Sequence, residues 1–128
     1  MGACAWAGGP VGAWASAIAV RKTSAPFLAT FLKGIGANWL VNLAVFNAAT
    51  ANSAGGKMAV LWMPIATFVA LGLEHSVANM FLIPLGMGCG ADVTVSDFLF
   101  GNLVPCIAGN IVGASVCVGA GNWYALMP

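Results

Sequence analysis

The stretch LGLEHSVANMFLIPLG, residues 71–86, places Glu74 and His75 side by side within an otherwise apolar segment. The whole chain of 128 residues carries only four Lys and Arg, three Asp and Glu, and one His. An ionisable group within an apolar membrane segment is costly, and it usually faces a bundle interior or a transport route. The pattern therefore indicates that this stretch holds both an interruption in a helix and the candidate functional site.

The composition is typical of a membrane protein. Charged residues make up 5% of the chain, hydrophobic residues make up 61%, and the mean hydropathy is +0.96. An average soluble domain has about 25% charged residues, and so few polar groups could not cover its surface. The bilayer is the solvent that suits this chain. A net charge of +1 gives no support for nucleic-acid binding, and no CxxC or Cys/His pattern predicts a metal or cofactor site.

The apolar segments predict an all-α fold, with two short polar links between them. The links TANSAGGK (50–57) and ADVTVSD (91–97) are typical of turns. They leave apolar segments at about 1–20, 26–49, 58–88 and 98–126.

The segment at 58–88 predicts a discontinuous transmembrane helix. It is longer than the roughly 20 residues needed to cross the hydrocarbon core, and Pro64, Gly72, Glu74 and Pro84 interrupt it. A long apolar run with such interruptions is typical of a broken helix in a transporter. We expect the break at about 64–74, with the second half-helix starting near Leu73.

A helix that starts inside the membrane favours anions. Its first N–H groups are free, and the dipole gives that end a partial positive charge. His75 is therefore expected to stay neutral until an anion beside it lets it hold a proton. Adjacent helical residues point about 100° apart, so Glu74 is expected to turn away from His75 and bond amides or helix ends. From the residues alone, anion passage, a proton relay and an ion-coupled transporter all remain open.

Three blocks resemble the formate/nitrite transporter family: GIGANWLVNLAVF (34–46), GLEHSVANMFLIPLG (72–86) and NLVPCIAGNIVGA (102–114). They occur in the family order and cover the chain from about Lys22 to Tyr124. The resemblance implies an all-α membrane protein with the aquaporin-like inverted-repeat bundle of six helices, assembled as a homopentamer with one pore in each protomer.

The resemblance also assigns the apolar segments to helices of that bundle. It makes about 1–20 the end of helix three, 26–49 helix four, 58–88 the broken helix five and 98–126 helix six. Helices one and two are then missing from this chain, together with a second broken helix whose threonine partners the central histidine. The resemblance places the link that carries Arg21 and Lys22 on the outer side, although the positive-inside rule would place it in the cytoplasm.

The resemblance carries site roles onto individual positions. It makes His75 the pore histidine and proton donor, Phe68 and Val41 the constriction, and Lys22 the vestibule cation that attracts anions. Glu74, Asn38 and Asn79 become polar support around the histidine, whereas Asn102 and Asn110 lie in the last-helix motif without a role. Taken alone, Phe68 and Val41 would be interpreted as lipid-facing or core residues.

The function that follows is passage of formate or nitrite through the bilayer, passive or proton-coupled, with transient protonation at His75. No nucleophile–base pair or carboxylate dyad supports an enzyme, and the paired Asn-Pro-Ala motifs of an aquaporin are absent. The alternatives are a relative that carries lactate, bicarbonate or hydrosulfide, and a non-conducting partial subunit with a structural or regulatory role. The plasma membrane and the plastid envelope are the expected hosts.

Overall fold

The computed structural model describes residues 8–127, and all its regular elements are helices. Four helices precede the C-terminal one: α1 (Pro10–Thr23), α2 (Phe27–Thr50), α3 (Ala54–Ala70) and α4 (Ser76–Gly88). The C-terminal helix is continuous and alternates between π and α geometry, as η1 (Asp97–Leu103), α5 (Val104–Val112), η2 (Gly113–Ala120) and α6 (Gly121–Leu126).

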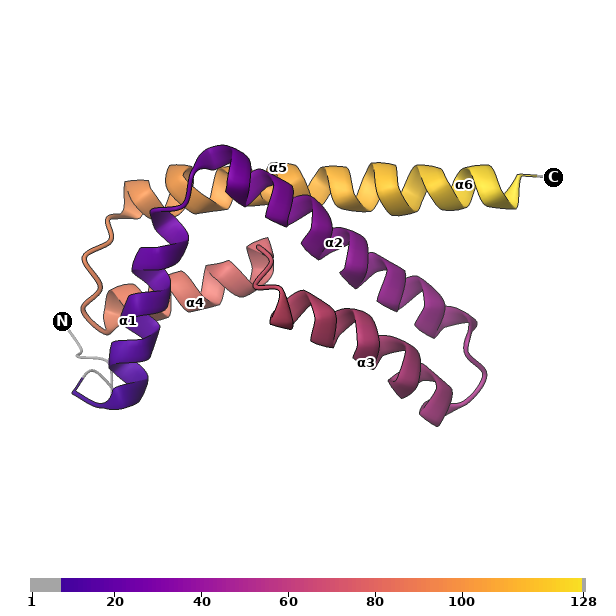
Figure 1. The fold of residues 1–128 in the computed structure, drawn as a ribbon, viewed down its shortest axis with the longest axis horizontal. Coiled ribbons are helices and arrows are strands. Elements are labelled where there is room, and N and C mark those ends of the chain that lie inside the picture. The colour runs from indigo at the N-terminus through magenta and orange to yellow at the C-terminus, as the bar shows by residue number, and fades with distance from the viewer. Residues whose placement is uncertain (1–7, 128) are drawn as a thin grey trace.

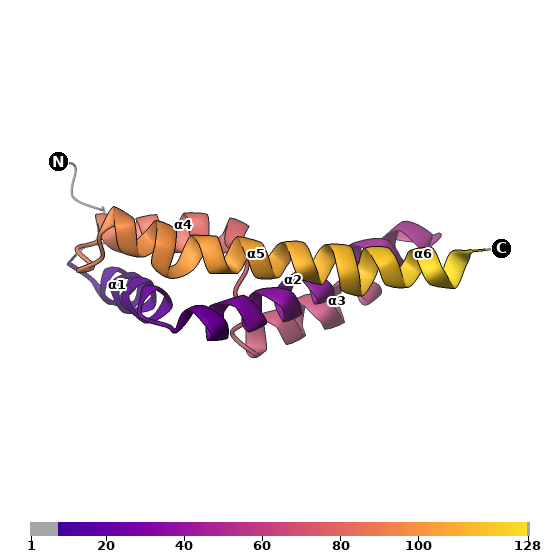
Figure 2. The same cartoon turned by 90° about the horizontal axis from the view of Figure 1, so that it is seen from above.

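The C-terminal helix runs along one side of the molecule, with α3 and α4 below it in the view of Figure 1. Helix α2 packs against both α5 and α3, and α1 packs against α4. Seen from above, the C-terminal helix runs the length of the molecule, and the turn between α3 and α4 lies near its middle (Figure 2). The two halves of the interrupted segment are therefore held by different partners, α3 by α2 and α4 by α1.

Small residues let the helix backbones touch, as expected for membrane helices. A Cβ added at Gly34 on α2 would lie 2.9 Å from the carbonyl oxygen of Cys106, and one at Gly109 on α5 would overlap the carbonyl oxygen of Phe31. The α1–α4 contact is equally close, because a Cβ at Gly86 would lie 2.5 Å from the carbonyl oxygen of Ala15. These contacts fix α2 on α5 and α1 on α4.

Apolar side chains cover most of the outside. Helix α3 buries none of its residues, and Met58, Trp62 and Met63 on it are each more than 70% exposed. Phe27–Thr50 and Asp97–Leu126 are long and apolar enough to cross a membrane, and Ala54–Ala70 and Ser76–Gly88 are shorter apolar helices. The surface is thus suited to lipid and to further membrane helices.

The helix boundaries differ from the expected ones in three places. Helix α3 starts at Ala54 within the predicted turn, because the side chain of Ser53 accepts a hydrogen bond from the Gly56 N–H and caps it. Pro64 lies inside α3 without ending it, so the break covers 71–75 and not 64–74. The first helix runs over Pro10–Thr23, with proline near its first position, and the part of 1–20 that precedes residue 8 lies outside the described residues.

Candidate functional site

The candidate site lies at the non-helical residues 71–75, which interrupt the helical segment between α3 and α4 and are called the break below. Helix α3 ends at Ala70, and Gly72 has a φ of +58°, a left-handed conformation that favours glycine. Helix α4 restarts at Ser76 rather than near Leu73, and His75 is its N-cap residue in an extended conformation. Glu74 and His75 therefore both lie outside the helix, so extended backbone, and not a helical turn, separates their side chains.

Asn110 on α5 holds the break in place from another helix. Its Oδ1 accepts hydrogen bonds from the backbone N–H and the hydroxyl of Ser76, each at 3.0 Å. Its Nδ2 donates to the carbonyl oxygens of Gly34 and Glu74, each at 2.9 Å. The Asn110 side chain is thus satisfied by two segments, residues 74–76 and Gly34 on α2, and it supplies the cap that the His75 side chain does not.

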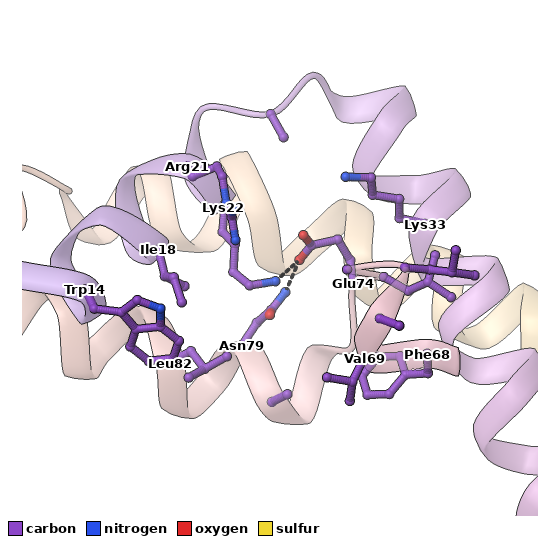
Figure 3. A pocket seen from close by; sticks show the side chains of 16 residues that line it. Trp14, Ile18, Arg21, Lys22, Lys33, Phe68, Val69, Glu74, Asn79 and Leu82 are labelled. Carbon is purple, nitrogen blue, oxygen red and sulfur yellow. Dashed lines mark hydrogen bonds and ion pairs between the residues drawn. The ribbon is translucent and has the colours of Figure 1, made fainter. Parts of the chain in front are cut away.

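Glu74 is the centre of a buried polar cluster (Figure 3). Its Oε2 accepts from Lys22 Nζ at 2.9 Å, from Asn79 Nδ2 at 2.6 Å and from Asn102 Nδ2 at 3.3 Å. Asn79 Nδ2 also donates to Asn102 Oδ1 at 2.7 Å, and Asn102 Nδ2 donates to the Lys22 carbonyl oxygen. The cluster ties α1, α4 and the C-terminal helix to the break.

The pairing balances the charge of Lys22. The side chains of Lys22 and Glu74 are 12% and 6% exposed, so the ion pair is shielded from water on most sides. Lys22, the residue predicted to attract anions in a vestibule, therefore lies 2.9 Å from this carboxylate. Its role toward anions stays a prediction.

His75 lies on another side of the same break. It is half-buried, and its ring meets the ring of Phe68 edge-on, with centroids 5.9 Å apart and planes at 68°. Phe68 also lines the pocket that Lys22 and Glu74 line, whereas His75 lies beyond that lining in the described part of the chain. Phe68 therefore contacts both the pocket and the histidine ring.

Asn38 and Val41 lie one turn apart on α2. Asn38 Nδ2 donates to the backbone carbonyl of Asn110 at 2.8 Å, which joins Asn38 to the network that holds the break. Val41 is half-buried and is not part of the pocket lining. The predicted residues thus separate into the Lys22–Glu74 ion pair with Asn79 hydrogen-bonded to it, an aromatic–imidazole pair (Phe68, His75), Asn38 on the Asn110 network, and Val41 apart from all three.

Sequence reasoning left Asn110 and Asn102 without a role, and Lys33 was not among the predicted site residues. The signal for the two asparagines was their occurrence in a motif of small and apolar residues, NLVPCIAGN, where an uncompensated amide would be costly. Lys33 lines the same pocket from α2. Within residues 8–127, no group of His, Cys, Asp and Glu side chains is arranged to hold a metal ion.

A broken apolar helix with an ionisable residue at its interruption defines a class of membrane transport proteins. The family model for the formate/nitrite transporter matches residues 1–124, and the chain therefore belongs to the formate/nitrite transporter family. This is a family of transporters and channels and not of enzymes, and the chain is part of an integral membrane protein.

Curated relatives and solved structures agree with this assignment. The chain is 45% identical over 115 residues to a probable formate transporter of Methanothermobacter thermautotrophicus, covering 88% of this chain and 42% of that protein. It is 35% identical over 121 residues to formate channel FocA of Escherichia coli strain K12, covering 80% and 42%. The chain thus spans about two fifths of the length of these relatives.

Two solved structures share the fold. A pentameric formate channel with formate bound aligns with a TM-score of 0.83 at 37% identity, over 92% of this chain and 53% of that chain. An ion channel of the same family aligns with a TM-score of 0.84 at 35% identity, over 90% and 46%. The all-helical arrangement described above is therefore shared with these two channels over about half of each of their chains.

Proposed function

We propose that the full-length protein carries formate and nitrite across the membrane by transient protonation of the anion at His75. The observation that supports this most is the position of His75. It is the chain's one histidine, half-buried at the N-terminal end of α4 and edge-on to Phe68 at 5.9 Å. Relatives and structural neighbours named as formate transporters and channels support the choice of cargo.

The physical problem is desolvation of the anion. A bare anion that enters a low-dielectric slit loses hydration energy of the order of tens of kcal/mol. Phe68 and Val41 offer no polar atom in exchange. A proton from the imidazole converts the anion into its neutral acid, which crosses the slit at a far lower cost. Beyond the slit the acid dissociates, and the proton either returns to His75 or leaves with the cargo.

This route selects conjugate bases of weak acids. Formate and nitrite can take up a proton, whereas chloride and nitrate cannot, because their acids are too strong to hold one. The break also favours an approaching anion, since α4 begins beside His75 and its N-terminal end carries a partial positive charge, while the Ser76 N–H itself is bonded to Asn110. We further propose that full-length subunits form a homopentamer with a route in each, as in the pentameric formate channel.

The test compares His75→Asn and His75→Phe with the unmodified full-length protein in liposomes. Influx of formate, nitrite and nitrate is followed at several pH values between about 5 and 8, a range that spans the ordinary pKa of His. We expect the unmodified protein to carry formate and nitrite faster as the outer pH falls, with little nitrate flux. Both variants are expected to lose most of the weak-acid flux.

Nitrate is the chemical control, because it resembles nitrite in size but accepts no proton. Unchanged formate flux and pH dependence in His75→Asn would refute the role of His75. Equal flux of nitrate and nitrite through the unmodified protein would refute protonation as the basis of selection.

A further inference from the structure

The side chain of Leu73 packs against a glycine of α2. A Cβ added at Gly36 would lie 3.4 Å from Cδ1 of Leu73 and 3.7 Å from its Cδ2, so both methyl groups lie over the bare backbone of this glycine. These are van der Waals distances, at which apolar groups are in contact. Leu73 is half-buried, whereas Leu71 in the same segment is 62% exposed. The contact of Leu73 with Gly36 is called the Leu73 seat below.

The backbone of Leu73 is bonded to the last turn of α3. Its N–H donates to the carbonyl oxygen of Phe68 at 3.3 Å. The ring of Phe68 in turn meets the ring of His75 edge-on, with centroids 5.9 Å apart. Leu73 therefore contacts α2 through its side chain and Phe68 through its backbone, so the seat fixes how far the backbone of Phe68 lies from α2.

The break is held at two points that act on different sides of it. Asn110 forms its hydrogen bonds with residues 74–76 and leaves the side of Phe68 to the Leu73 seat. Gly72 lies between the seat and α3 with a φ of +58°, and a Cβ added there meets nothing within 4 Å. Packing at Gly72 therefore adds no restraint on this side of the break.

We propose that Leu73 is a positioning residue that sets the size limit of the cargo, because it fixes the Phe68 ring relative to α2. Val41, the other predicted constriction residue, also lies on α2, so a shift of Phe68 against α2 changes the gap between them. A gap with fixed walls rejects a larger acid by steric overlap, whereas a gap with a mobile wall yields to it. The cargo rests on the proposed function, but the seat is testable without transport.

The test exchanges volume between the two positions of the seat. Leu73→Ala removes the Cγ and both methyl groups, and Gly36→Val adds a Cβ with its methyl groups, so Leu73→Ala/Gly36→Val restores the volume. Gly36→Val alone overfills the seat, because a Cβ there already lies at contact distance from Leu73. Leu71→Ala is the matched control, since it makes the same change at an exposed leucine of the same segment.

The first measurement is the ratio of lactate influx to formate influx in liposomes with full-length protein, after subtraction of the flux through protein-free liposomes. Both cargoes are anions of weak acids, so protonation at His75 acts on both and the ratio reports on size. Since discrimination by one methylene is worth about 10- to 200-fold, we expect the ratio to rise about five- to tenfold in Leu73→Ala and to return within about twofold of the unmodified ratio in the double variant. Leu71→Ala is expected to leave the ratio unchanged.

The second measurement requires no transport. Diethyl pyrocarbonate acylates the neutral imidazole, and mass spectrometry of the peptide that carries His75 gives the rate of modification. Loss of the seat frees Phe68 and the break, so the imidazole opens to the reagent more often; we expect the rate to rise about two- to fivefold in Leu73→Ala. The double variant is expected to restore the rate, and Leu71→Ala to leave it unchanged.

Each outcome decides the proposal. Formate influx with an unchanged lactate ratio in Leu73→Ala overturns the size limit and leaves the proposed function intact. A raised ratio that Gly36→Val does not reverse also overturns it, since the effect then does not arise at the seat. Where Leu73→Ala gives no folded protein, Gly36→Val alone must raise the ratio. If the imidazole rate follows the exchange of volume but the unmodified protein carries no formate, the seat stands, and the proposed function fails together with the size limit.

Discussion

Asn110 caps helix α4 from a different helix: its Oδ1 lies 3.0 Å from both the backbone nitrogen and the hydroxyl of Ser76. The same side chain donates to the carbonyl of Glu74 at 2.9 Å, so one amide forms hydrogen bonds with the residues before and after His75. The backbone around the histidine is thus held by a residue 35 positions away in the sequence, and the position of the imidazole depends on α5.

Asn110→Ala is expected to destabilise the protein more than an ordinary polar substitution. It leaves the Ser76 N–H and the carbonyls of Gly34 and Glu74 without their partner, and each unsatisfied buried group costs about 1–3 kcal/mol. We expect a total loss above about 2 kcal/mol and a lower thermal midpoint of the detergent-solubilised full-length protein.

The control for Asn110 is Asn42→Ala on α2. The Asn42 side chain donates to the Asn38 carbonyl within its own helix, so its removal breaks no contact between elements. Similar thermal midpoints for the two variants would contradict the cap assigned to Asn110.

Breaking the Lys22–Glu74 pair on one side is expected to cost more than removing both charges. Lys22→Met leaves a carboxylate that is 6% exposed without its cation, and removing one partner of a buried pair costs about 3–5 kcal/mol. In Lys22→Met/Glu74→Gln the amide can still accept from Asn79, and no charge is left unpaired. A double-mutant cycle on the thermal midpoint measures this; additive losses would show that the pair is not coupled.

Two glycines are expected to respond differently to alanine. At Gly72 a Cβ meets nothing within 4 Å, so Gly72→Ala carries only the penalty for a φ of +58°, about 1–2 kcal/mol. At Gly109 a Cβ overlaps the carbonyl oxygen of Phe31, which forces α2 and α5 apart. We expect a modest drop in the thermal midpoint for Gly72→Ala and loss of folded protein for Gly109→Ala. Equal effects would argue against the backbone contact between α2 and α5.

Phe68→Ala is expected to weaken selection without abolishing flux. Removal of the ring that lines the pocket and contacts His75 is expected to let water accompany the anion, so that protonation is no longer required for passage. We expect chloride and nitrate currents to appear in liposomes while formate influx persists. Phe81→Ala, at a residue of α4 that is 65% exposed, is the control and should leave selection unchanged.

Much of the fold could be predicted because apolar length and turn composition act locally. The links near 50–57 and 91–97, together with Pro26, mark where helices of this composition must stop or start. Pro64 placed the start of the predicted break too early, since a proline inside a membrane helix can be accommodated when neighbouring groups satisfy the freed carbonyl. Gly72 was the better signal, because the left-handed turn requires a residue without a Cβ.

The sequence by itself determined that this is a helical membrane protein with one broken helix and one histidine at the break, because hydropathy, glycine and charge act over a few neighbouring residues. Only the tertiary structure decided the partners of those residues. Lys22 is paired with Glu74 from 52 residues away, whereas Arg21 beside it lines the pocket without an ion pair to any residue of 8–127. Coulomb energy and hydrogen bonding depend on distances of a few ångströms between helices, and packing of α2, α4 and α5 sets those distances.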